Sequence, residues 1–276
     1  MENYSVLMSV HINENAEHFT ASIQSLLDQT VVTNDFVIVC DGPLSKELNM
    51  VLESYDSRYP GLFQIVRLPR NVGVGLAAKE GLAVCRNDLI AKMDSDDISL
   101  PDRCRIQLSR FSENPDLAMI GGVIEEFDNR TGKVFAVRTV PEDNDSIRTR
   151  ARRRSPFNNV TMMYRKSAAE AAGGYRDLRR GEDYDLYLRM LINGCYAENL
   201  PQTLARVRVD SDTHRRRASW SAMKGCASIW WHSYRVGFSS LADLIICLCG
   251  QMFLVICPGR IQQMLYKRFL RKQINE

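Results

Sequence analysis

Short apolar runs alternate with helical patterns through the first hundred residues, and this alternation constrains the fold more than any other feature of the chain. The apolar runs have the length of β-strands and cover residues 5–11, 36–40, 63–68 and 89–93. Between them, apolar side chains recur at helical spacing, as in the series Phe19, Ile23, Leu26 and Leu27. Strands that alternate with helices predict an α/β protein, with a Rossmann-like, mainly parallel sheet flanked by helices on both faces.

The rest of the sequence predicts helices and strands in a less regular order. A helix is expected from Pro101 to about Glu113, since proline is favoured at a helix start. Strands are predicted at residues 118–127, 134–140 and 160–164, and helices at residues 166–172 and 182–192. From about Ala218 onward the pattern is helical, which predicts a helical C-terminal tail.

Composition and cysteine spacing exclude several classes of protein. Hydrophobic residues make up 45% of the chain and charged residues 25%, which excludes a disordered or collagen-like chain. A net charge of +3 does not indicate a nucleic-acid partner. The eight cysteines form neither a CxxC pair nor a zinc-type spacing with histidine, so we expect reduced thiols in a cytoplasmic protein. A strand begins at Ser5 without a charged leader or cleavage site before it, which argues against secretion.

Polar side chains follow each of the four predicted strands. In the order of the chain, the residues at these ends are His11 and Glu14, then Asp41, then Asn71 and Gly73, and finally Asp94, Ser95, Asp96 and Asp97. In parallel α/β sheets, ligands bind beyond the carboxyl ends of the strands. The sequence therefore predicts a binding site at this edge of the sheet.

The tripeptide Asp94-Ser95-Asp96 is the most specific of these signals. Two acids that follow a buried strand can point into one pocket, and their hard oxygen atoms suit Mg²⁺ or Mn²⁺ bound to a diphosphate. Such a cation would neutralise the charge on a departing diphosphate. Asp97 remains an alternative ligand, and an acidic turn or helix cap explains the same residues without a metal.

Asp41 and the segment that begins at Asn71 have weaker claims to a ligand. The Asp41 carboxylate could accept a hydrogen bond from a base N–H or a ribose hydroxyl, although an Asp-Gly-Pro turn accounts for it as well. Asn71 could cap the next helix, while Gly73 would allow the backbone to approach a ligand closely. The segment does not match the dinucleotide fingerprint GxGxxG, because Ala78 occupies the third glycine position.

Two further motifs lie in the second half of the chain. Glu182 and Asp183 open a predicted helix, where an acid could serve as a general base toward an acceptor hydroxyl or could simply complement the helix dipole. His214 and the arginines that follow it, including Arg216, could close over a diphosphate, because arginine binds phosphate with two hydrogen bonds. A solvated basic loop is the alternative for this second motif.

With these residues assembled, the chain resembles glycosyltransferase family 2, and in particular its bacterial polysaccharide and galactosyltransferase-like branch. Members of this family share the GT-A fold. The resemblance covers about residues 4–215 and depends on the order of several motifs. These motifs are His11 to Glu14, Val39-Cys40-Asp41-Gly42, Asn71-x-Gly73, Met93 to Asp97, Pro156 to Asn159, Met162 to Ser167, Gly173-Gly174-Tyr175 and Gly181-Glu182-Asp183.

On the donor side, the resemblance implies that Asp41 contacts a uracil-type base and that Glu14 and the backbone near His11 line the same pocket. It further implies that Asp94 reaches the ribose or sugar and that Asp96 binds the metal ion.

On the acceptor side, the resemblance implies that Asp183 is the general base and that Glu182 orients the loop or the acceptor. Two departures stand out. Ala78-Lys79 replaces an Arg-Asn pair that many members carry, and residues 210–217 lack the QxxRW-type signature of processive synthases.

These observations favour an inverting glycosyltransferase that moves a hexose from a nucleoside diphosphate sugar, expected to be a UDP-sugar, to a carbohydrate or lipid-linked acceptor of surface polysaccharide synthesis. Residues 1–215 would form the transferase domain, with a nucleotide-binding half at about 1–100 and an acceptor half at about 101–215. A metal-dependent nucleotidyltransferase is one alternative, although it would usually carry a glycine- and lysine-rich phosphate loop. A non-catalytic nucleotide-sugar-binding protein is another, and it would not need Asp183.

Residues 216–276 form a separate helical region in this interpretation. The apolar run from Leu244 to Ile256 is too short to span a bilayer, which requires about 20 residues. The next segment, residues 260–272, mixes apolar side chains with five basic ones. That combination predicts a peripheral contact with the anionic inner face of the cell membrane, and packing of the helices on the domain is the alternative.

Overall fold

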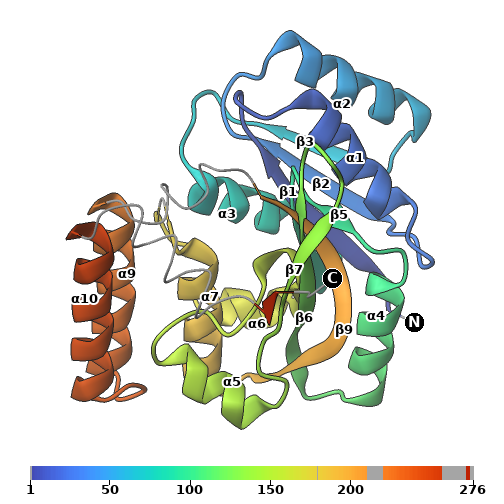
Figure 1. The fold of residues 1–276 in the computed structure, drawn as a ribbon. Helices are drawn as coiled ribbons and strands as arrows, with labels where there is room; N and C mark the ends of the chain where they lie inside the picture. Colours follow the sequence, from blue (N-terminus) through green and yellow to red (C-terminus); the bar gives the residue numbers. More distant parts are fainter. Residues whose placement is uncertain (1, 179, 210–219, 257–271, 274–276) are drawn as a thin grey trace.

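The computed structural model describes residues 2–178, 180–209, 220–256 and 272–273, and these residues form one α/β fold around a mixed sheet (Figure 1). The strand order is β10-β7-β6-β8-β4-β1-β2-β3, and β9 pairs with both β5 and β6. Helices cover both faces of the sheet, as the sequence predicts.

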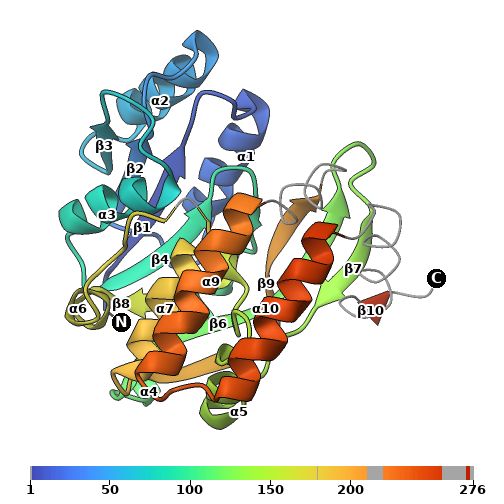
Figure 2. The ribbon, with the colours of Figure 1, turned by 90° about the vertical axis from the view of Figure 1, so that its left-hand side faces the viewer.

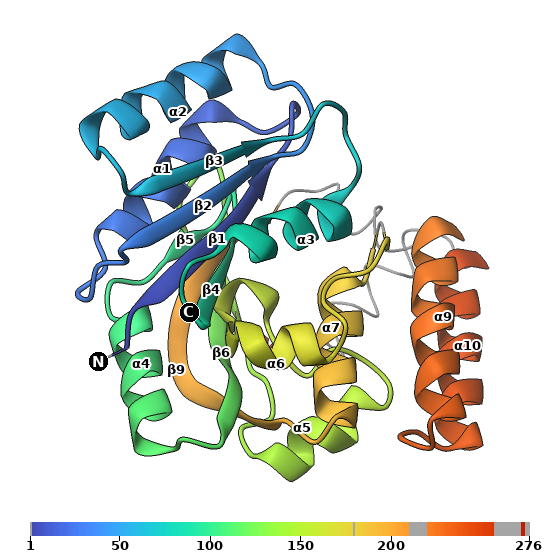
Figure 3. The same ribbon diagram turned by 180° about the vertical axis from the view of Figure 1, so that it is seen from behind.

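The N-terminal half contains the parallel part of the sheet. Its elements are β1 (Tyr4–Val10), α1 (Ala16–Leu27), β2 (Asp35–Cys40), α2 (Lys46–Arg58), β3 (Phe63–Arg67), α3 (Val74–Val84) and β4 (Leu89–Asp94). The four strands pair in parallel. Strands β1, β2 and β4 are buried on both faces and are therefore mostly apolar, whereas the edge strand β3 is only partly buried. Helices α1 and α2 cover one face and α3 covers the other (Figure 3). The four predicted strands are confirmed.

The second half is less regular. Its elements are β5 (Ile98–Ser99), α4 (Arg103–Glu113), β6 (Leu117–Asp128), β7 (Val134–Arg138), α5 (Asn144–Ala151), η1 (Asn159–Thr161), β8 (Met163–Arg165), α6 (Lys166–Ala171), α7 (Glu182–Ile192) and β9 (Tyr196–Val209). The strand predicted at residues 160–164 is wrong in its first part, because residues 159–161 form a 3₁₀ turn before the short strand β8. Helix α5 and the long strand β9 were not predicted.

Two helices, α9 (Trp220–Arg235) and α10 (Leu241–Ile256), form a hairpin that packs on this half of the molecule (Figure 2). Ile229 and Trp230 of α9 are buried in the same core as α7, and α10 contributes Leu244 and Cys247. The indole nitrogen of Trp230 donates to the Arg153 carbonyl at 3.1 Å, while the Arg153 guanidinium pairs with Asp243 at 2.6 Å. Part of the arginine cluster at residues 148–154 therefore anchors the hairpin.

The outer face of α10 is apolar. Its exposed hydrophobic side chains are Leu241, Ile245, Ile246, Met252 and Phe253. Among the helices that the structure describes, none is long and apolar enough to cross a membrane. The short strand β10 (Lys272–Gln273) pairs antiparallel with β7, while residues 257–271 lie outside the described part of the chain.

Candidate active site

The carboxyl ends of β1, β2 and β4 meet the first turns of α3 and α7 at one edge of the sheet (Figures 1 and 3). Strand β1 is central here, because it pairs with β2 on one side and with β4 on the other. Helix α3 lies close to the loop that leads into α7: a Cβ atom added at Gly75 would lie 3.2 Å from the Cβ atom of Glu182. Most of the predicted site residues therefore lie at the same edge.

Asp94 is the last residue of β4, opposite Ser9 of β1. Its Oδ1 atom lies 3.3 Å from the Lys92 ammonium and 3.4 Å from the amide nitrogen of Asn159. Its backbone carbonyl accepts a hydrogen bond from the Ser22 hydroxyl at 2.9 Å. The side chain nevertheless remains 40% exposed, so it can still reach a ligand.

Glu14 and Asp96 bring two more carboxyl groups close to Asp94. The Ser95 hydroxyl donates to Glu14 at 2.7 Å, which ties the turn after β1 to the turn after β4. Burial, together with the negative charges of Asp94 and Glu14, raises the pKa of Asp96 to about 7. A cluster of acids that repel each other in this way is a suitable environment for a cation.

The oxygen atoms of Asp94 and Asp96 fit Mg²⁺ or Mn²⁺. Within the described residues, no group of three or more His, Cys, Asp or Glu side chains forms a complete metal site. A complete site is not needed, because Mg²⁺ at phosphate-transfer sites is usually bound by one or two carboxylates together with the phosphates of the substrate.

Asp97 has a different environment from Asp96. Its side chain is buried and accepts a hydrogen bond from the backbone N–H of Arg208 on β9, at 2.8 Å. Arg208 in turn donates through Nε to the Asp96 carbonyl at 3.0 Å, and its guanidinium lies 4.8 Å from the ring centroid of Phe127. Asp97 thus fixes the turn to β9, which favours Asp96 over Asp97 as the metal ligand.

The carboxylate of Asp41 organises the loop that precedes α3. It accepts hydrogen bonds from the Asn71 amide at 2.9 Å and from the backbone N–H groups of Val72 at 2.7 Å and Gly73 at 3.1 Å. The expectation that Asn71 caps α3 is wrong. The N-cap residue of α3 is Gly73, with φ +94°, and no described side chain caps the first turn of the helix. The Asn71 amide donates to Asp41 instead.

His11 and Arg216 are the other two residues expected to contact the donor. The His11 side chain is exposed at the end of β1, and its carbonyl accepts a hydrogen bond from the backbone N–H of Glu14 at 3.0 Å. Arg216, with His214 and the neighbouring arginines, lies outside the described residues.

Glu182 and Asp183 begin α7 and are only partly exposed. The N-cap Gly181 has φ +81°, and no described side chain caps the helix. The Tyr175 hydroxyl donates to Asp183 at 3.0 Å, which orients that carboxylate. Burial raises the pKa of Asp183, and burial together with the charge of Asp183 raises the pKa of Glu182 to about 8.

Comparison with known proteins places these motifs in one family. A sequence profile described as glycosyl transferase family 2 matches residues 5–172. An uncharacterized glycosyltransferase of Haemophilus influenzae is 34% identical over 269 residues, which cover 98% of this chain and 99% of the relative. The chain belongs to glycosyltransferase family 2. This membership favours sugar transfer over nucleotidyl transfer.

Other similar proteins agree with this family 2 assignment. The UDP-Gal:alpha-D-GlcNAc-diphosphoundecaprenol beta-1,3-galactosyltransferase of Escherichia coli is 31% identical, with 98% of this chain and 97% of that enzyme covered. S. aureus TarS 1–349 in complex with UDP has a TM-score of 0.62 at 16% identity, covering 97% of this chain and 75% of that one. The mannosyltransferase PcManGT of Pyrobaculum calidifontis, in complex with GDP-Man and Mn²⁺, has a TM-score of 0.65 at 12% identity, covering 93% and 70%. The predicted GT-A fold is confirmed.

Lys92 is a residue of this candidate site that the sequence interpretation did not include. Its side chain is 1% exposed, and its ammonium lies 3.3 Å from Oδ1 of Asp94. Burial alone would lower the pKa of Lys92, but the charges of Asp94, Asp183 and Glu182 outweigh it and raise that pKa. A lysine inside an otherwise apolar strand was the available signal, because such a residue is rarely buried without a partner.

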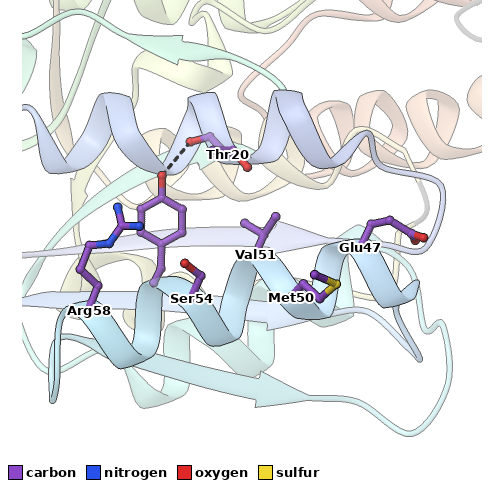
Figure 4. A pocket seen from close by; sticks show the side chains of 7 residues that line it. Thr20, Glu47, Met50, Val51, Ser54 and Arg58 are labelled. Carbon is purple, nitrogen blue, oxygen red and sulfur yellow. Dashed lines mark hydrogen bonds between the residues drawn. The ribbon is translucent and has the colours of Figure 1, made fainter.

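A surface pocket lies apart from these acids, between α1 and α2 (Figure 4). Its lining residues are Thr20, Glu47, Met50, Val51, Ser54, Tyr55 and Arg58. Within this lining, the Tyr55 hydroxyl donates to the Thr20 carbonyl at 3.4 Å. This pocket contains none of the predicted site residues of the family 2 enzyme.

Proposed function

We propose that this enzyme moves a hexose from a UDP-sugar to a carbohydrate or lipid-linked acceptor of surface polysaccharide synthesis, with inversion at the anomeric carbon. One observation carries the proposal: the buried ammonium of Lys92 lies 3.3 Å from Asp94 in the turn after β4, and the charges of Glu182 and Asp183 in the turn that begins α7 act on the same ammonium. One turn suits a diphosphate leaving group and the other suits a base. The E. coli relative, similar over nearly its whole length, is named for transfer from UDP-Gal to a lipid diphosphate acceptor.

Donor binding is assigned to the ends of β1, β2 and β4. We propose that the uracil base lies near Asp41, Glu14 and the backbone at His11, and that Asn71 and Gly73 shape the loop beside it. Asp94 would contact the ribose or the sugar.

Mn²⁺ or Mg²⁺, held by Asp96 and Asp94 with the diphosphate, would supply positive charge against the leaving group. Arg216 is proposed as a further phosphate contact.

The acceptor is assigned to the first turn of α7. Asp183 would take the proton of an acceptor hydroxyl, and the oxygen would attack the anomeric carbon on the face opposite to UDP, so that the configuration inverts. A raised pKa suits this role, because a base is most effective when its pKa is close to the working pH. The Tyr175 hydroxyl keeps the carboxylate oriented, and Glu182 would orient the acceptor or the loop.

A screen of UDP-, GDP- and dTDP-sugars tests this function. Each donor is added with and without Mn²⁺, and both nucleotide release and the melting temperature are measured. We expect a UDP-hexose to stabilise the protein in a Mn²⁺-dependent way, and NMR of the product to show a β-linkage from the α-linked donor. Retention of the α configuration, or stabilisation by no nucleotide sugar, would contradict the proposal.

For the C-terminal region, residues 216–276, we propose peripheral contact with the cytoplasmic face of the cell membrane beside the transferase domain of residues 1–215. The exposed apolar face of α10 and the basic segment at residues 260–272 support it. Liposome flotation tests it: Ile245→Ser with Phe253→Ser, both exposed, should reduce binding to anionic vesicles. Equal flotation of this variant and the wild-type protein would reject the membrane contact.

A further inference from the structure

The loop that leads into α7 passes between two helices that are distant from it in sequence, α3 and α9 (Figure 3). On the α3 side, a Cβ atom added at Gly75 would lie 2.5 Å from the Arg176 carbonyl oxygen and 2.8 Å from that of Leu178. On the α9 side, a Cβ atom added at Gly225 would lie 2.8 Å from the Arg180 carbonyl oxygen. Both helices therefore contact the main chain of this loop directly.

A third glycine completes the contact. Gly181 is the N-cap of α7 and has φ +81°, and a Cβ atom added there would lie 3.0 Å from Cδ1 of Ile229 on α9. We call Gly75, Gly181 and Gly225 the glycine junction. Any larger residue at Gly75 or Gly225 would separate a helix from the loop, because non-bonded Cβ atoms do not approach oxygen so closely.

Two of these glycines lie within helices, where glycine is less favourable than alanine. Their position is explained by the close contact, since alanine would otherwise be the better residue. Gly250 in the same hairpin differs: no described atom lies within 4 Å of a Cβ atom added there. The close approach is thus specific to the loop side of α9 and is not a general property of the hairpin.

The loop needs this support because of the charges that it presents. Glu182 and Asp183 are adjacent, burial raises the pKa of both, and no described side chain caps the helix that they begin. Arg189 pairs with Asp185 within α7 at 2.7 Å and donates to the Gly174 carbonyl at 2.6 Å. It therefore ties α7 to the start of the loop but does not bind Glu182 or Asp183.

Helix α9 is itself held firmly. Ile229 and Trp230 are buried, and the Trp230 indole donates to the Arg153 carbonyl at 3.1 Å. We infer that α9 is a positioning element of the active site: Gly225 and Ile229 press residues 180–183 against α3, which places the Asp183 carboxylate for proton transfer. The inference rests on the proposed role of Asp183 as the base.

The test compares Gly225→Ala with Gly250→Ala, the same change at two helical positions of one hairpin. Displacement of a reacting group by a fraction of an ångström is enough to slow a reaction strongly, so Gly225→Ala should lower kcat for transfer about tenfold or more. Its affinity for UDP and Mn²⁺ should stay within about twofold of wild type, because the donor residues lie on the strand ends. Gly250→Ala should keep wild-type kcat.

A second variant, Ile229→Val, removes the Cδ1 atom that faces Gly181 and adds no atom to the helix. It provides the test if Gly225→Ala does not fold. It should also lower kcat while UDP affinity is kept. Wild-type kcat in a folded Gly225→Ala or Ile229→Val enzyme would overturn the inference, as would an equal loss in Gly250→Ala. If Asp183→Asn keeps wild-type turnover, the proposed base is wrong. If Asp183→Asn loses turnover while Gly225→Ala and Ile229→Val keep it, the role of Asp183 stands and only the inference about α9 fails.

Discussion

The two acidic turns of the site are supported in different ways. The turn at residues 94–97 follows a central strand, and its geometry comes from the β1–β4 register and from the bond between Asp97 and the Arg208 backbone. The turn at residues 181–183 begins a helix, and it is held by α3 and α9, which are far away in sequence. The first turn is therefore built into the sheet, whereas the second depends on tertiary packing. Substitutions should separate donor binding from turnover accordingly.

The largest expected effect concerns the turn in the sheet. Asp96→Ala should abolish Mn²⁺-dependent binding of UDP while the fold persists, because a metal ligand is lost without disturbing the bond between Asp97 and Arg208. Calorimetry with UDP and Mn²⁺ provides the measurement. Asp97→Asn is the matched variant, since asparagine can still accept the hydrogen bond from Arg208. If Asp97→Asn loses the metal-dependent affinity and Asp96→Ala keeps it, the two assignments must be exchanged.

The next effect concerns Lys92, whose ammonium interacts with the acids of both turns. Lys92→Met should lower kcat about tenfold or more, because Asp94 loses its ion pair and Asp183 loses a neighbouring positive charge. Lys79→Met is a suitable control, since Lys79 is exposed on α3. Lys92→Arg should recover part of the lost rate if the positive charge is what matters. Equal kcat values for Lys92→Met and Lys79→Met would show that Lys92 has no role in turnover.

The smallest effect is on stability. The pKa of Glu182 is raised from 4.5 to about 8, first by burial and then by the charge of Asp183. The folded state therefore binds this proton more tightly than the unfolded chain, and the free energy of unfolding should decrease as the pH rises from about 4.5 to 8.

Glu182→Gln cannot lose a proton, so its melting temperature should exceed that of the wild type by more at pH 8 than at pH 5. Glu53→Gln, at an exposed position on α2, should differ from the wild type in melting temperature by the same amount at pH 8 and at pH 5. An equal gain in melting temperature at both pH values would show that folding does not raise the pKa of Glu182.

The parallel half of the fold was predictable because its signals are local. Strands β1, β2 and β4 are buried on both faces and so are mostly apolar, and acids lie at their carboxyl ends or shortly after them. Strand β9 was missed for the opposite reason: it includes Pro201 and polar residues such as Gln202, and it becomes a strand through long pairing with β6. Helix α5 was not predicted, because it is short and buries only Ile147 and Ala151, which leaves no helical apolar period to detect.

Contacts made by tertiary packing could not be predicted from the sequence. Asn71 has the residue type of a helix cap, but the chain brings the Asp41 carboxylate to it, and the cap falls on Gly73. Gly225 has no local signature that distinguishes it from Gly250, and only the position of the Arg180 carbonyl does so. Motifs at strand ends were therefore easier to predict than the packing that holds them.

The central claim is that the turn at α7 carries the base and the turn at β4 carries the donor, and Asp183→Asn tests it most directly. Asparagine keeps the size and can still accept from Tyr175, but it cannot take a proton. UDP-sugar affinity should remain at the wild-type value while transfer falls by about 10² or more, the range expected for a positioned base. Asp177→Asn, an exposed position in the preceding loop, should leave both unchanged. Near-normal transfer by Asp183→Asn, with unchanged donor affinity, would show that the base lies elsewhere.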